Sequence, residues 1–149
     1  MLLDSSTVES SELVQETFDF WFMDKEHIRT PFPSYIRNEL KQISTNRFYD
    51  WASKLNESAK EEMNDEMIGE KFEEIIFDVA TQLVKTDDEK ITILYPFLPR
   101  IGDQIMDSSD KVGQISSRYI DKDGDKSFLK VKLNNADGST WETSFELPL

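Results

Sequence analysis

Apolar residues recur at two different spacings along this chain. Up to about residue 85 they return every three or four positions, which is the spacing of one face of an α-helix. Beyond about residue 106 they alternate with polar residues, which is the spacing of a half-buried β-strand. The pattern predicts an α+β fold, in which about four N-terminal helices pack on a C-terminal antiparallel β-meander.

The first two helices are predicted from caps and breakers. Ser6 and Glu9 form a capping-box pair, and we expect a first helix at about residues 7–23. Prolines then force extended backbone up to Ser34, which is the expected cap of a second helix. That helix is expected to end near residues 44–46, where three polar residues follow one another.

Two further apolar stripes follow, within residues 48–59 and 68–83. Projected on one helix, they are out of phase by about a third of a turn. A single straight helix could not bury both stripes. We therefore expect a break near Asn64 and Asp65.

A proline-containing joint at residues 91–105 connects the two halves. Pro96 and Pro99 cannot lie inside a helix or a central strand, so we expect the joint to cross as short extended pieces. Short connections predict that residues 1–149 form a single domain with one core, made of a helical half (7–85), this joint and a β half (106–149).

Three strands are expected in the β half, at about residues 112–120, 128–133 and 141–147. Gly124 and Gly138 each follow an aspartate between these strands, where hairpin turns require positive φ. The sheet is expected to have one solvated face, with the helices covering the other.

Segments 102–105, 112–115, 129–133 and 138–141 show a rhythm of strands and glycines. This rhythm is similar to that of small SH3-like barrels. The resemblance implies a small barrel whose first strand comes from the joint, a fold that commonly hosts binding rather than catalysis. The nucleic-acid role of many such barrels is not expected here, because the chain lacks net positive charge.

Charge narrows the choice of partner. The formal net charge is −13, with 21 acidic against 10 basic residues in positions 1–90 and 9 against 7 in the remainder. This field disfavours nucleic acid and anionic membrane surfaces, and it suits a basic protein surface. The start has no signal-peptide pattern, no apolar run is long enough to span a bilayer, and cysteine is absent. We expect a cytoplasmic protein.

Five carboxylates at strict i+4 spacing form the most unusual feature of the sequence, and we call them the acidic ridge. They are Glu62, Glu66, Glu70, Glu74 and Asp78. One interpretation is a docking strip for a basic partner, and the other is a solvated helix face. A metal site is not expected, because the ridge lies opposite the apolar stripe.

A run of aromatic and apolar residues at the end of the first predicted helix is a second candidate surface. It comprises Phe18, Phe20, Trp21, Phe22 and Met23. We expect these residues to pack in the core against the proline-rich loop. The alternative is an exposed patch that closes a homodimer or receives a partner.

Catalytic chemistry has little support. His27 is the sole histidine, and no nucleophile elbow, phosphate-binding loop, dinucleotide fingerprint or metalloprotease motif occurs. Asp121, Asp123 and Asp125 begin like a calcium loop but lack its glycine and its final glutamate, so a hairpin turn is expected there. We expect no cofactor and no metal, and enzymatic activity is unsupported.

The leading hypothesis is therefore a non-catalytic protein-binding module, such as an inhibitor, an immunity-type protein or a regulatory protein, that docks a basic partner through the acidic ridge. The alternative is a small-ligand binder or enzyme with a pocket at the joint near Tyr95, Arg100 and Asp103. There Arg100 could clamp a carboxylate or phosphate. Oligomeric state stays open, and so does a purely structural role in a larger assembly.

Overall fold

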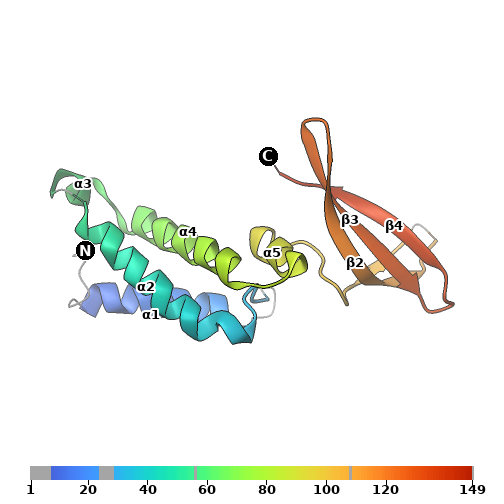
Figure 1. Cartoon of the computed structure of the whole chain (residues 1–149), viewed down its shortest axis with the longest axis horizontal. Helices are drawn as coiled ribbons and strands as arrows, with labels where there is room; N and C mark the ends of the chain where they lie inside the picture. Colours follow the sequence, from blue (N-terminus) through green and yellow to red (C-terminus); the bar gives the residue numbers. More distant parts are fainter. Residues whose placement is uncertain (1–7, 24–28, 56, 108, 149) are drawn as a thin grey trace. The chain divides into compact units, whose positions relative to one another are not determined.

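The computed structural model describes residues 8–23, 29–55, 57–107 and 109–148. The chain divides into two compact units, Met1–Pro96 and Phe97–Leu149. The first is helical and the second is an antiparallel sheet, so the predicted α+β class is confirmed (Figure 1). A core shared by both halves stays a prediction.

The helical unit contains five α-helices and one short 3-10 helix among the described residues. They are α1 (Val8–Phe22), η1 (Ser34–Ile36), α2 (Arg37–Ser53), α3 (Glu57–Glu62), α4 (Asp65–Leu83) and α5 (Asp87–Leu94). The start of α1 agrees with the sequence, but the proposed cap Ser6 lies outside the described residues. Ser34 is not a side-chain cap, because the cap position before η1 is Pro33 and no side-chain hydrogen bond is made there.

Phe72 of α4 lies at the centre of the helical core. Its ring centroid is 5.4 Å from that of Phe18 on α1 and 4.6 Å from that of Phe48 on α2, and all three side chains are fully or almost fully buried. Aromatic side chains of this size contribute large buried areas to a core. One residue therefore links three helices.

The aromatic run packs largely as expected. Phe18 and Trp21 are buried, and Phe22 packs against the same core. Phe32 of the proline-rich loop lies edge-on to Trp21 and Phe22, at ring-centroid distances of 6.2 and 5.8 Å. The expectation that the whole run packs in the core is wrong for Phe20 and Met23, which are both exposed.

The predicted break at residues 44–46 is wrong, because α2 runs through it without interruption. Its buried positions are Leu40, Ser44, Phe48 and Ala52, which follow one another at i+4. Ser44 is polar but small, so it fits on the buried stripe that packs on α4. Tertiary packing thus overrides the modest helix propensity of the polar stretch.

The predicted break near Asn64 is confirmed. Helix α3 ends at Glu62 and α4 begins at Asp65, with the Asn64 side chain accepting a hydrogen bond from the Met67 backbone N–H at 2.8 Å. An asparagine cap of this kind satisfies one of the free N–H groups of the first turn.

The joint is not wholly extended, contrary to expectation. Residues Asp87–Leu94 form α5, and both prolines follow it. The Thr86 side chain accepts a hydrogen bond from the Glu89 backbone N–H, and the Glu89 carboxylate accepts one from the Thr86 backbone N–H. This capping box begins a helix that ends before Pro96, so neither proline interrupts it.

The sheet unit is a meander of four antiparallel strands in the order β1-β2-β3-β4. Their bounds are β1 (Gln104–Met106), β2 (Val112–Asp123), β3 (Lys126–Asn135) and β4 (Thr140–Glu146). Gly124 and Gly138 have φ of 64° and 88°, which confirms the predicted turns. The joint supplies β1, and the described strands pair as an open meander. Of the two predicted alternatives, a meander or a small barrel, the structure therefore shows the meander.

Alternation along β3 separates the two faces of the sheet. Leu129, Val131 and Leu133 are buried, whereas Lys130 and Lys132 lie on the opposite face. A register shift in β2 between Ile115 and Ser117 places Arg118 opposite Val131, where regular pairing would place Ser117. The Arg118 guanidinium is consequently buried, and it donates to the Pro99 carbonyl at 2.9 Å.

Candidate binding surface

Helix α4 turns four carboxylates of the acidic ridge to solvent. Its buried side carries Ile68, Phe72, Ile76, Val79 and Ala80. Glu66, Glu70, Glu74 and Asp78 follow the same i+4 spacing two positions away from that stripe, and all four are exposed. The cap and the apolar stripe therefore fix the orientation of this part of the ridge.

Glu62 is not on the same helix as the other four ridge residues. It is the last residue of α3, separated from α4 by the break at Met63 and Asn64, and it is exposed. The strict spacing in the sequence is thus continuous only from Glu66 to Asp78.

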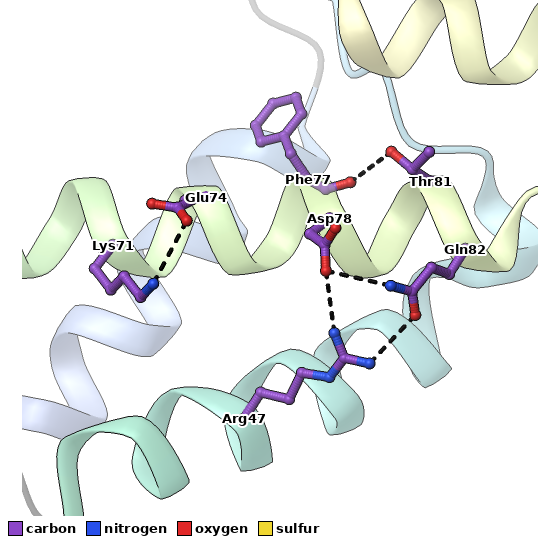
Figure 2. Close-up of polar contacts among 7 residues, drawn as sticks. All are labelled: Arg47, Lys71, Glu74, Phe77, Asp78, Thr81 and Gln82. Carbon is purple, nitrogen blue, oxygen red and sulfur yellow. Dashed lines mark hydrogen bonds and ion pairs between the residues drawn. The ribbon is translucent and has the colours of Figure 1, made fainter. Parts of the chain in front are cut away.

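Two bases lie beside the C-terminal part of the ridge (Figure 2). Arg47 of α2 donates from Nη1 to Asp78 Oδ2 at 3.2 Å, and Lys71 Nζ lies 3.4 Å from Glu74 Oε1. Both carboxylates remain largely solvated, so each pair contributes about 0–1 kcal/mol. In the described part of the chain no ion pair involves Glu66 or Glu70.

A shallow groove of about 460 Å³, which we call the α4–α5 groove, adjoins the ridge. Its apolar lining is Trp21 of α1, Phe77 of α4, Ile93 and Leu94 of α5, and Pro96. Glu70, Glu73 and Glu74 line it from α4. Two ridge carboxylates, Glu70 and Glu74, are therefore also groove residues.

Aromatic packing holds the apolar side of the groove. Trp21 lies edge-on to Phe77 at a ring-centroid distance of 4.9 Å, and only 8% of Trp21 is exposed. Its indole N–H has no acceptor among the described residues. Leu94, at the end of α5, is 57% exposed. The groove thus combines one exposed aliphatic side chain, Leu94, with the packed aromatic pair Trp21 and Phe77.

The position of α5 depends on a contact with η1. The Tyr35 hydroxyl donates to the Glu89 carboxylate at 2.6 Å and accepts from the Lys85 backbone N–H at 3.3 Å. The bond from Tyr35 lowers the pKa of the Glu89 carboxyl and raises the pKa of the Tyr35 phenol. Hydrogen bonds that favour the ionised carboxylate therefore fix the start of the helix that carries Ile93 and Leu94.

The alternative pocket residues fall in different units. Tyr95 caps the C-terminus of α5 in the helical unit, whereas Arg100 and Asp103 belong to the sheet unit. The Arg100 backbone N–H donates to Asp103 Oδ2 at 2.8 Å, and the Asp103 N–H donates to the Arg100 carbonyl at 2.9 Å. Asp103 thus closes a turn that contains Gly102, whose φ is 93°. A ligand pocket at these residues stays a prediction.

Sequence reasoning missed the groove. Its α5 residues were expected in extended backbone, and Glu73 and Phe77 were not grouped with them. The available signal was the pair Thr86 and Glu89, spaced as in a capping box immediately before an apolar run.

Two classes of site find no support in the described parts of the chain. There, no group of three or more His, Cys, Asp or Glu side chains could hold a metal ion, and no helix is long and apolar enough to cross a bilayer. His27 lies outside the described residues.

Comparison of the chain with protein-family models, curated proteins and solved structures gives no match.

Proposed function

We propose that this chain is a non-catalytic protein-binding module that docks a basic partner through the acidic ridge. The observation that carries the proposal is the exposure of four evenly spaced carboxylates, Glu66, Glu70, Glu74 and Asp78, along one side of α4. An inhibitor, an immunity-type protein or a regulatory protein in the cytoplasm would use such a surface.

Electrostatics along α4 support this role. Carboxylates at i and i+4 repel each other at a cost of about 0.2–0.5 kcal/mol per pair. Lys71 and Arg47 offset the repulsion at Glu74 and Asp78. Among the described residues no base pairs with Glu66 or Glu70, so solvent screens the repulsion between these two carboxylates. A partner that brings Lys or Arg to these positions would relieve the repulsion on binding.

Binding of this kind has a recognisable salt dependence. Charge complementarity mainly raises the association rate, and the effect falls as ions screen the surface. The Debye length is about 10 Å at 0.1 M salt and about 3 Å at 1 M. A complex formed through the ridge should therefore weaken strongly between these concentrations.

The test is capture of partners from the source lysate at both salt concentrations. The native protein is compared with a ridge variant carrying Glu66→Lys, Glu70→Lys and Glu74→Lys. A control with the same charge change carries Glu12→Lys, Glu16→Lys and Glu142→Lys at exposed positions outside α4. We expect a basic partner that binds the native and control proteins at low salt and is lost with the ridge variant. Equal capture by the ridge variant would contradict the proposal.

A further inference from the structure

The α4–α5 groove combines two chemistries. Its floor is apolar, with Phe77 projecting from the side of α4 away from Arg47 (Figure 2), and Leu94 leaves more than half of its surface in solvent. Glu70, Glu73 and Glu74 lie on the α4 side, spaced i, i+3 and i+4. The described structure supplies one base there, Lys71, which pairs with Glu74.

These charges restrict what can occupy the groove. An acidic or neutral apolar segment would bring its surface against three carboxylates and lose their solvation without compensation. A segment with Lys or Arg beside its apolar side chains would keep those carboxylates paired. The apolar floor and the acidic side together select an occupant that is both apolar and basic.

The walls also restrict the backbone conformation of the occupant. Helices α4 and α5 satisfy their own backbone hydrogen bonds, so the groove has no strand edge to which an extended peptide could pair. A helix brings its backbone already hydrogen-bonded. The volume of about 460 Å³ has room for a few side chains from one helix face.

We infer that the α4–α5 groove receives an amphipathic helix of a basic partner protein, with aliphatic side chains against Phe77 and Leu94 and Lys or Arg against Glu70, Glu73 and Glu74. This inference rests on the proposed function, since it assigns the part of the partner that the ridge attracts. It adds an apolar anchor, which sets the register of the complex.

The probes are two peptides of about 14 residues, or about four helical turns, made of Leu and Lys. One places Leu at i, i+3, i+4 and i+7, and the other has the same composition with the Leu positions scrambled. Affinities are measured by calorimetry on the full chain. The groove variant is Leu94→Gln, and its control is Ile101→Gln, which changes an exposed aliphatic residue of the sheet unit in the same way.

The amphipathic peptide is expected to bind at least about tenfold more tightly than the scrambled one. Leu94→Gln should remove most of that difference, whereas Ile101→Gln should leave it unchanged. In nitrogen-labelled protein, the amphipathic peptide should shift the indole signal of Trp21 and leave that of Trp141, which donates to Asn135 at 2.9 Å in the sheet unit.

Equal binding of both peptides, binding of neither, or an unchanged preference in Leu94→Gln would overturn the groove assignment. So would a native homodimer that Leu94→Gln converts to monomer, because a second copy would then be the occupant.

The ridge variant separates the two proposals. If it weakens both peptides equally while Leu94→Gln has no effect, the ridge stands and the groove does not. If it changes neither affinity, the proposed function fails.

Discussion

Among the glycines of the sheet unit, Gly113 has the least room for a side chain, because an added Cβ meets nothing within 4 Å at Gly102, Gly124 and Gly138. It is buried on β2, and a Cβ atom there would lie 2.8 Å from Asn135 Oδ1 and 2.8 Å from Trp141 Nε1. Those two atoms form the hydrogen bond that links the end of β3 to the start of β4. The absence of a side chain thus allows this polar contact to lie over β2.

We predict that Gly113→Ala destabilises the protein by about 1–3 kcal/mol, the usual cost of overpacking a filled site. Chemical denaturation followed by Trp fluorescence measures the change. The control is Gly69→Ala in α4, where an added Cβ meets nothing within 4 Å and helix propensity favours alanine by about 1 kcal/mol. Equal stability of Gly113→Ala and the native protein would show that the strand ends move apart at no cost.

At the scale of single elements, α5 depends on one carboxylate. Glu89 accepts hydrogen bonds from the Tyr35 hydroxyl and from the Thr86 hydroxyl and backbone N–H. The Tyr35 hydroxyl contributes most to lowering the pKa of Glu89 in the folded protein. Because the folded pKa lies below the unfolded one, this group stabilises the fold above the unfolded pKa of about 4.3, and the contribution is lost as pH falls through the folded pKa.

The predicted outcome is a pH-dependent difference between the native protein and Glu89→Gln. The native protein should be the more stable at neutral pH, and the difference should shrink as pH falls below about 4.3. Denaturant titrations at a series of pH values measure it. Tyr35→Phe serves as the second variant, since it removes the largest cause of the shift and should reduce the pH dependence. A difference that stays constant across the series would rule out the carboxylate as its source.

Local patterns predicted the elements whose signals lie close together in sequence. The break at Asn64 follows from the phase of two apolar stripes, and the turns at Gly124 and Gly138 follow from their need for positive φ. The exposed orientation of α4 carboxylates follows in the same way from the buried stripe. These features depend on residues within a few turns of one another.

Features that depend on distant partners escaped prediction. Helix α2 continues through Ser44 because that small side chain fits on the buried stripe of α2, a role that its polarity conceals. Arg118 reaches the buried face through a register shift that simple alternation does not foresee. The α4–α5 groove needs three helices to meet, so no single stretch encodes it. Helix α5 is an exception, because the spacing of Thr86 and Glu89 in the sequence is that of a capping box and could have predicted it.

At the scale of the whole molecule, charge and fold divide at nearly the same place. Residues 1–90 carry 21 acidic and 10 basic residues, and the helical unit ends at Pro96. The remaining sequence is nearly balanced, with cross-strand contacts such as Lys126 to Glu146 at 3.7 Å on the sheet. The field that would steer a basic partner thus originates mainly in the helical unit.

The last prediction concerns the independence of that unit. Its core consists of residues from α1, η1, α2, α4 and α5 and from the loop that carries Phe32, with Phe72 at the centre. A chain of 96 residues is long enough to bury its own core. We therefore expect the fragment 1–96 to retain helical circular dichroism and to unfold cooperatively on heating.

Phe72→Ala in the same fragment provides the control. It should remove about 3–5 kcal/mol and with it most of the transition, because it empties the contact between three helices. Cooperative unfolding of the native fragment would place the core, the ridge and the α4–α5 groove in one independently folding body. A fragment that is unfolded at low temperature would instead support the single shared core expected from the sequence, since the helices would then depend on residues 97–149 for their stability.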